Sequence, residues 1–464
     1  MNIREPVVYL GNFYSIAMPV QKTEKLAGWG NYPVIESYTG SVRSAADVQQ
    51  VLEQYTLVPR GLGRSYGDQA VNAQNYVGDC THMNYFLDWN EAEGILECGA
   101  GASLEEIITA FAPKGWLPMI CPGTKFVTIG GAIANDIHGK AHHTDGSFVN
   151  CVVSFTILLA DGSIVTASRD ERPDLFWANF GGLGLLGVIL TARIKLRKIE
   201  TTYFKQKSLK IKNLDHMLEA LDTYDHEYNY SVAWIDALAK GANTGSGVLT
   251  LGNAAKLADL PEKLKAAPLK LHPTSKLAVP FYMPNFTLNN FTVRILNKVI
   301  GFVQNSPKEF IHYEKFFFPL DAINNWNRGY GKRGFIQYQF VIPETNGKQV
   351  LTEILNMIAD SGCTPFLNVF KKMGDGQGLL SFPFKGYTLA IDFPVTKKLF
   401  EFTPKLDAKV LHAGGRLYLG KDALLAEGMF KAMYPQYAEW KEVKQKYDPQ
   451  TKFSSNIGRR LGLS

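Results

Sequence analysis

The spacing of apolar residues in the first 200 positions predicts short helices and strands that alternate along the chain. Residues 44–55 begin with Ser44 and Asp47, three positions apart as in a helical capping box, and then place apolar side chains on one helical face. Residues 101–115 show the same combination. In residues 152–168 two apolar runs flank an Asp-Gly pair, which predicts a hairpin. The pattern indicates an α+β domain made of small units.

From about residue 203 the pattern changes to longer strands and helices. An alternating strand is followed by a helix, two strands, a second helix and a last strand, in residues 334–343, 346–362, 364–373, 386–395, 398–415 and 416–421. This β-α-β-β-α-β order predicts an antiparallel sheet with helices on one face.

Residues 256–298 differ in composition from the rest of this half. They contain five prolines and seven Lys or Arg residues, against two acids. A loop of this length is often functional. Two interpretations stay open: a long surface excursion with a few buried anchors, or a flap that meets a ligand with both an apolar tail and a phosphate.

The composition is that of an ordinary globular protein. The 464 residues allow two or three domains, and a net charge of +6 spread along the chain indicates a mild preference for anionic ligands but no nucleic-acid partner. Five cysteines without a CxxC pair argue against a disulfide scaffold and a zinc site. The N-terminus is a poor signal peptide, and no segment approaches the roughly 18 apolar residues of a membrane-spanning helix. We therefore expect a soluble or peripheral protein in a reducing compartment.

Residues 182–187 match the GxGxxG pattern of dinucleotide sites, but their surroundings do not fit. That fingerprint requires a strand before it and a helix after it. Here residues 173–180 predict a helix before the glycines, and residues 188–196 predict a strand after them. A conventional NAD-binding unit is therefore not expected, although the turn can offer backbone amides to a ligand.

Residues 121–143 contain four glycines that allow close backbone approach, and threonines whose neighbouring amides can form an anion-binding nest. His138, His142 and His143 raise the question of a metal. No acid is spaced as a partner ligand, and two adjacent histidines do not readily point at one ion from a strand. We expect no metal site. With the second glycine-rich loop, RGLGRSYGD at residues 60–68, this stretch suits an extended nucleotide cofactor between two α+β subdomains.

Four segments together resemble the PCMH-type FAD-binding domain of the vanillyl-alcohol-oxidase superfamily: residues 60–68, 122–143, 174–189 and 447–461. Further segments extend the resemblance through the second half to one member family, the decaprenylphosphoryl-β-D-ribose oxidases: residues 231–237, 334–343, 366–374, 391–394 and 414–422. The resemblance covers essentially the whole chain. It implies an FAD-binding domain at 1–202 that is completed by 416–464, and a substrate domain at 203–415 whose mobile flap lies near 256–298.

The resemblance also implies which residues bind FAD: Arg60, Gly61, Leu62, Gly63, Arg64, Ser65, Tyr66, Gly67, Asp68, Gln69, Gly123, Thr128, Ile129, Gly130, Gly131, Asn135, Asp136, Ile137, His138, Ile189 and Tyr418. Many superfamily members tether the flavin covalently through a histidine. Arg64 stands at that position here and cannot form the bond. We therefore expect non-covalent FAD.

The family oxidises the 2′-hydroxyl of a lipid-phosphate-linked ribose to a ketone by hydride transfer to the flavin. An NADH-dependent reductase then completes the epimerisation to the arabinose form, a cell-wall precursor. By resemblance, Lys421, His138 and Tyr66 are the catalytic candidates, with Lys421 stabilising negative charge. The candidates for substrate binding are Lys371, Gln337, Gln339, Trp234 and Lys421.

The sequence departs from the mycobacterial members of the family at three positions. Ala390 replaces a cysteine, Thr388 an asparagine and Phe317 a tyrosine. None of these changes removes a candidate catalytic group, but they leave the exact sugar open.

The resemblance implies a polyprenylphosphoryl sugar as substrate, the reductase as partner and peripheral contact with the inner face of the membrane; the periplasmic side stays open. Two alternatives remain. One is a soluble aldose, alditol or sugar-lactone oxidase that uses oxygen. The other is a flavin-binding subunit without chemistry of its own, against which the polar candidates around the flavin argue.

Overall fold

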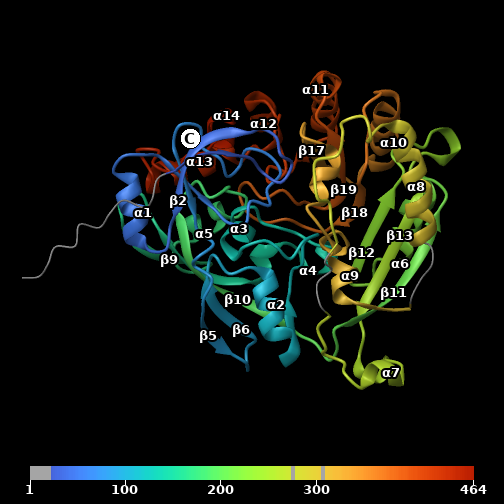
Figure 1. Cartoon of the computed structure of the whole chain (residues 1–464), viewed down its shortest axis with the longest axis horizontal. Coiled ribbons are helices and arrows are strands. Elements are labelled where there is room, and N and C mark those ends of the chain that lie inside the picture. Colours follow the sequence, from blue (N-terminus) through green and yellow to red (C-terminus); the bar gives the residue numbers. More distant parts are fainter. Residues whose placement is uncertain (1–21, 273–276, 305–308) are drawn as a thin grey trace, which may run out of the picture.

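The computed structural model of the chain describes residues 22–272, 277–304 and 309–464 (Figure 1). Residues 1–21 of the expected FAD domain and residues 273–276 of the expected flap lie outside these ranges.

The N-terminal half contains two sheets. The first has four strands in the order β1 (Lys22–Leu26), β2 (Ile35–Ser41), β4 (Tyr76–Asp79) and β3 (Leu57–Arg60). Strand β4 pairs in parallel with β2 and β3. Helix α1 (Ala45–Leu52) packs on this sheet through the apolar face predicted from the sequence, and the capping box of Ser44 and Asp47 is confirmed.

The second sheet is antiparallel. Its order is β5 (Phe86–Asn90), β6 (Ile95–Gly99), β10 (Val188–Lys198), β8 (Val152–Leu158) and β9 (Ile164–Ser168), with β7 (Trp116–Pro118) also on β10. The predicted hairpin is β8–β9. Helix α2 (Leu104–Phe111) starts at the predicted capping box. Helix α5 (Pro173–Asn179) precedes the GxGxxG segment and β10 follows it, which confirms that this segment is not a dinucleotide-binding turn of the strand–helix kind.

The second half forms an eight-stranded antiparallel sheet. Its order is β15 (Phe310–His312), β11 (Tyr203–Ile211), β13 (Gly247–Ala254), β12 (Tyr230–Ile235), β18 (Asn368–Met373), β19 (Gly386–Pro394), β17 (Phe335–Pro343) and β20 (Arg416–Leu417). Helices α6 (Leu214–Tyr224), α10 (Gly347–Asp360) and α11 (Lys397–His412) pack on one face of this sheet. The predicted β-α-β-β-α-β order is confirmed by β17, α10, β18, β19, α11 and β20.

Strand β17 differs from its predicted half-buried alternation, because all its residues except Pro343 are buried. Helices cover one face of the sheet, and the N-terminal half covers the other, where Gly30 accepts a backbone hydrogen bond from Phe335. The polar members of the alternation, Gln337 and Gln339, therefore face the boundary between the two halves rather than solvent.

The C-terminal segment returns to the N-terminal half. It contains α12 (Glu427–Met433), α13 (Tyr437–Tyr447) and α14 (Asn456–Arg460), and α13 packs against α5 (Figure 1). Leu57 donates a backbone hydrogen bond to Lys452 at 2.8 Å, and the Trp440 indole donates to the Ala178 carbonyl at 2.8 Å. The chain thus crosses the boundary between the halves twice, although the exact domain limits stay a prediction.

Candidate active site

A large cavity lies between the N-terminal half and the eight-stranded sheet. It has about 1840 Å³ of empty space, including open solvent. Most of the residues expected at the cofactor and substrate line it, namely Arg60, Gly61, Leu62, Gly63, Arg64, Ser65, Tyr66, Gln69, Gly123, Thr128, Gly130, Gly131, Asn135, Ile137, His138, Ile189, Tyr418, Gln337, Gln339, Lys371 and Lys421. Five do not line it: Gly67, Asp68, Ile129, Asp136 and Trp234. One cavity therefore joins the glycine-rich loops to the polar groups of the second half.

The loop after β3 presents free backbone amides to this cavity. Among the residues that the structure describes, none accepts a hydrogen bond from the backbone N–H groups of residues 61–65. Gly61 packs so closely on Thr128 that a Cβ there would lie 2.2 Å from the threonine Oγ1, and Gly63 has a φ of +65°. A run of free amides beside a cavity is a site for an anionic group such as a pyrophosphate.

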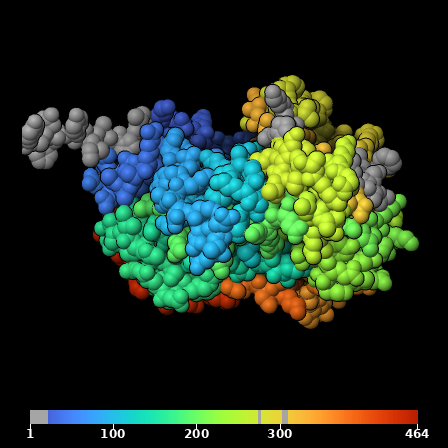
Figure 2. Space-filling view, turned by 90° about the horizontal axis from the view of Figure 1, so that it is seen from below, coloured from blue at the N-terminus to red at the C-terminus, as the bar shows by residue number. Residues whose placement is uncertain are grey.

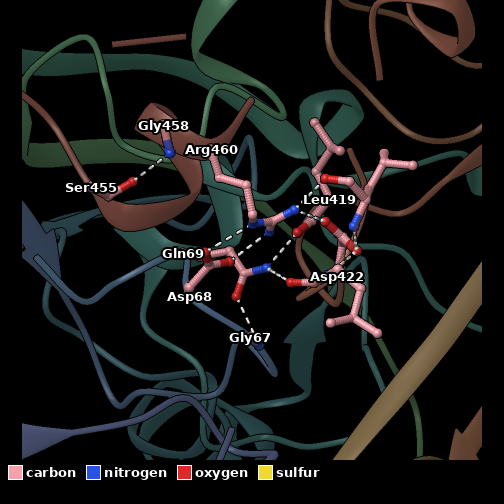
Figure 3. Close-up of polar contacts among 10 residues, drawn as sticks. Gly67, Asp68, Gln69, Leu419, Asp422, Ser455, Gly458 and Arg460 are labelled. Carbon is pink, nitrogen blue, oxygen red and sulfur yellow. Dashed lines mark hydrogen bonds and ion pairs between the residues drawn. The ribbon is translucent and has the colours of Figure 1, made fainter. Parts of the chain in front are cut away.

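The end of this loop is clamped to the loop that carries Lys421 (Figure 3). Gln69 donates from Nε2 to the carbonyls of Leu419 and Asp422, both at 2.6 Å, and accepts from the Gly67 N–H at 2.9 Å. Arg460 binds both carboxylate oxygens of Asp68, at 2.7 and 3.0 Å, and Asp422 at 2.9 Å. Asp68, expected at the cofactor, instead holds the loop in place through Arg460.

Four buried polar atoms at the cavity have no partner among the described residues: Arg64 Nε, Asn135 Oδ1, His138 Nδ1 and Gln339 Oε1. Buried polar groups are nearly always hydrogen-bonded in a native protein, so orphaned donors and acceptors indicate a polar ligand. With the free amides of the glycine loop, these residues fit FAD. The Arg64 guanidinium lies 4.0 Å from the Trp29 ring and 5.1 Å from the Phe126 ring.

The hydrogen bonds around Gln339 decide the tautomer of His138. Thr388 donates its hydroxyl proton to the Phe340 carbonyl at 2.7 Å, so its oxygen accepts from Gln339 Nε2 at 3.1 Å. The same amide nitrogen lies 3.1 Å from His138 Nε2, which must then accept. A neutral imidazole that accepts at Nε2 carries its proton at Nδ1. Burial, followed by the charges of Lys371, His142 and Lys421, holds the pKa of His138 well below its usual value. His138 is thus a neutral donor toward the cavity, which argues against a role as proton acceptor.

Lys421 is held by an amide that is itself anchored to a carboxylate. Lys421 Nζ donates to Gln337 Oε1, and Gln337 Nε2 donates to Asp392 Oδ1 at 2.5 Å. Tyr330 donates to the other Asp392 oxygen at 2.8 Å. Burial lowers the pKa of Lys421 to about 8 and raises that of Asp392 to about 6. Lys421 Nζ also lies 5.3 Å from the centre of the Tyr66 ring.

A second lysine, Lys371 on β18, is held by a weaker hydrogen bond than Lys421. Its Nζ contacts the Gly139 carbonyl at 3.4 Å, and no carboxylate binds it among the described residues. Burial, then the charges of Lys421 and Lys140, lowers the pKa of Lys371 to about 7. Lys140 donates to the Phe316 carbonyl, and burial lowers its pKa to about 8. Neither Lys371 nor Lys140 has a carboxylate partner among the described residues, and two such neighbouring cations favour an anionic ligand.

The remaining candidates lie outside the cavity for identifiable reasons. Asp136 is fully buried and accepts hydrogen bonds from Ser147, Ser381 and the Val149 N–H, so it braces its own loop. Trp234 stands opposite Val369, which lines the cavity, but its own ring lies one strand further along the sheet. Asp136 and Trp234 therefore do not line the cavity in this structure, and their part in binding stays a prediction.

Among the three departures, only Ala390 lines the cavity. Thr388 acts through Gln339, as described above, and Phe317 packs in a buried aromatic cluster with Phe204 and Phe316. Of the three, Ala390 therefore has the most direct influence on the shape of the site.

His142 and His143 belong to a helical turn, α4 (His142–Asp145), and not to the strand that the sequence suggested. Their rings diverge: His142 Nδ1 accepts from the Gly374 N–H, and His143 Nε2 lies 3.0 Å from the Tyr228 carbonyl. Within the described residues no group of three His, Cys, Asp or Glu side chains could hold a metal ion.

Sequence reasoning did not single out Asp392 and Lys140. A signal for Asp392 was available, because it is an acid within the apolar strand GYTLAIDFP. A charged residue inside a strand buried on both faces requires a partner.

Comparison with known proteins finds one family match in each half of the chain. Residues 39–168 match the family described as FAD binding domain, and residues 331–461 match D-arabinono-1,4-lactone oxidase. The chain is 39% identical to decaprenylphosphoryl-β-D-ribose oxidase of Mycolicibacterium smegmatis, over 95% of this chain and 98% of that protein. It is 30% identical to the "uncharacterized protein in mprA 5′ region" of Streptomyces coelicolor, over 78% and 100% of the two chains. Xylooligosaccharide oxidase of Thermothelomyces thermophilus is 37% identical over 30% of this chain and 28% of its own.

Proposed function

The chain belongs to the decaprenylphosphoryl-β-D-ribose oxidase family, and on this premise we propose that it is an FAD-dependent oxidoreductase of polyprenylphosphoryl-β-D-ribose. It converts the 2′-hydroxyl to the 2′-ketone, the first half of an epimerisation to the arabinose form. The observation that carries the proposal is the single cavity in which the loop of free amides meets Lys421, Lys371, Gln337 and Gln339.

The bound flavin supplies the hydride acceptor. The protein must bind the phosphate, orient the sugar and take up the hydroxyl proton. Lys371 has the charge and the lack of a carboxylate partner that suit the phosphate. His138 and Gln339 offer a free donor and a free acceptor that suit sugar hydroxyls. Lys421, whose pKa is about 8, has the acidity to exchange a proton near neutral pH.

The proposal includes the partners that this chemistry requires. A keto sugar becomes arabinose only when a hydride is returned to the other face, so an NADH-dependent reductase completes the epimerisation. A polyprenyl phosphate is held in a membrane, and we place the protein peripherally at the inner face. No helix among the described residues has the length and apolar character to cross a bilayer.

The test is an absorption spectrum followed by anaerobic titration. Acid precipitation of the purified protein should release its flavin into the supernatant, because Arg64 cannot form a covalent tether. A polyprenylphosphoryl ribose should bleach the bound flavin, whereas free ribose or xylitol should not. A protein that takes up no FAD, or that bleaches only with free polyols, would overturn the proposal.

A second candidate, a soluble aldose, alditol or sugar-lactone oxidase, is favoured by the match of residues 331–461 to D-arabinono-1,4-lactone oxidase. Such an enzyme produces peroxide rapidly with a free sugar or lactone in air. An oxygen electrode with free sugars therefore separates the two functions.

A further inference from the structure

Residues 277–304 carry large apolar side chains into solvent. We use "apolar surface" for Phe281, Tyr282, Phe286, Phe291, Ile295 and Val299, all of which are exposed. Phe286 and Phe291 keep 78% and 73% of their side-chain accessibility. Single exposed apolar residues are normal, but a contiguous group marks an interaction site.

Helix α8 (Asn290–Gln304) turns an apolar face outward. It buries Val293 and Asn297 against the sheet, where Asn297 donates to Asp236 at 2.7 Å. Phe291, Ile295 and Val299 follow one another at helical spacing on the exposed side. A surface helix ordinarily keeps its apolar side chains on the core, so Phe291, Ile295 and Val299 form a second apolar face that has no partner among the described residues.

The segment before α8 is held in a defined shape. Arg328 donates to the Pro280 carbonyl at 2.9 Å, and Arg333 donates to the Asn285 carbonyl at 2.9 Å. The Asn289 carboxamide caps α8 by accepting from the Phe291 and Thr292 amides at 2.9 and 3.1 Å. Two arginines and a cap thus present the exposed aromatics on a fixed scaffold.

The charge of this region is one-sided. Residues 277–304 contain no Asp or Glu, while Arg294 and Lys298 of α8 are exposed, as is nearby Lys332. Exposed aromatic residues flanked by Lys and Arg are the combination by which peripheral proteins enter the interface of an anionic bilayer. A surface that binds a protein of mixed charge has no need to exclude Asp and Glu completely, as residues 277–304 do.

The segment that carries the apolar surface is connected to residues that line the cavity. Strand β14 (Leu277–Ala278) pairs in parallel with β16 (Ile323–Asn324), and Trp326, two residues after β16, lines the cavity. In Figure 2 yellow and orange residues form a projection at the upper edge of the molecule.

We propose that the apolar surface inserts into the interface of an anionic lipid bilayer and brings the cavity entrance to the membrane. The identity of the molecule drawn from the membrane rests on the proposed function, but insertion itself does not. The aromatic side chains enter the boundary between headgroups and acyl chains, and Arg294, Lys298 and Lys332 meet the lipid phosphates.

The test is sedimentation of the full-length, FAD-loaded protein with vesicles of phosphatidylcholine, with and without phosphatidylglycerol. The test variant is Phe286→Ser/Phe291→Ser. The control is Leu87→Ser/Ile164→Ser, which removes two exposed apolar residues, each 54% exposed, from the N-terminal half. We expect wild type and control to bind the anionic vesicles, and the test variant to lose about tenfold or more in partitioning. Flavin absorbance and thermal midpoint report that each variant is folded.

Three results would overturn insertion: no vesicle binding by the wild type, equal loss in both variants, or a concentration-dependent dimer that the test variant abolishes without any vesicle binding. A water-soluble short-chain polyprenylphosphoryl ribose separates this proposal from the proposed function. If it bleaches the flavin of the test variant as fast as that of wild type, the proposed oxidation is supported independently of the result of the vesicle sedimentation. If it bleaches neither protein, the proposed function fails while vesicle binding still decides insertion.

Discussion

Gln337 donates from Nε2 to Asp392 Oδ1 at 2.5 Å, and this bond decides which end of the Gln337 amide faces Lys421. With the nitrogen bound to the carboxylate, the oxygen is left to accept from Lys421. Asp392 is completely buried, and among the described residues its other side-chain hydrogen bond comes from the Tyr330 hydroxyl. The carboxylate therefore acts on the candidate catalytic lysine through one oriented amide.

Asp392→Asn should lower kcat about tenfold, because an asparagine can meet Gln337 in either orientation and so no longer fixes the lysine. The loss of a nearby anion should also move the kinetic pKa of Lys421 downward, since Asp392 raises it. The measurement is kcat as a function of pH at saturating substrate. Lys421→Met defines the activity that remains when the lysine is absent. Asp407→Asn, another buried aspartate that accepts from a tyrosine, is the control and should leave kcat unchanged. An unchanged pH profile in Asp392→Asn would contradict the positioning role.

Lys371 should make substrate affinity depend on pH. Its pKa of about 7 means that the ammonium is lost as the pH rises through neutrality, while a phosphodiester keeps its single negative charge. KM for the polyprenylphosphoryl sugar should therefore rise by up to about tenfold between pH 7.5 and 8.5. In Lys371→Arg, whose guanidinium stays charged, KM should be flat over this range. A flat wild-type profile would show that Lys371 does not bind the phosphate.

The elements were largely predictable from the sequence because their signals are local. The capping boxes of α1 and α2, the hairpin β8–β9 and the order of elements from β17 to β20 each depend on residues close together in the chain. The pairing that brings β12 beside β18 has no local signal, and neither does the burial of both faces of β17.

The site was predictable only where the residue type itself carries the chemistry. The glycine loops were identified through their motifs, and Lys421 through the family resemblance. Asp68 was placed at the cofactor because it lies in the motif, but its partner Arg460 is 392 residues away. Trp234 and Asp136 lie off the cavity for a similar reason, because residues outside the local motif decide where a side chain points. Asp392 was missed since its role comes from Gln337 on the adjacent strand.

Asp407 should make stability fall with rising pH. Burial raises its pKa to about 7, against the opposing hydrogen bond from Tyr338. The folded state then binds a proton that the unfolded state releases near pH 4, so this group destabilises the fold progressively from about pH 4 to 7, by at most about 1.4 kcal/mol per pH unit. Asp407→Asn removes this dependence. Thermal midpoints should be measured at pH 5, 6, 7 and 8. The midpoint of the variant minus that of wild type should increase up to pH 7 and stay constant above it.

Arg460 forms ion pairs with two buried carboxylates, and among the described residues no other cation forms an ion pair with either of them. Its loss should strongly destabilise the protein for that reason. Arg460→Met leaves Asp68 and Asp422 without their ion pair and should destabilise the protein by about 3–5 kcal/mol. Because Asp68 belongs to the loop of free amides, FAD affinity should fall as well. The measurements are the thermal midpoint with and without added FAD, and a flavin-binding titration. Arg459→Met is the matched control: this neighbour on α14 binds the neutral groups of Asn72 and Ser454, so its loss strands no charge and should cost far less. If both variants lose the same thermal stability and the same FAD affinity, α14 depends on arginine packing alone. The ion pair would then not hold the cofactor loop.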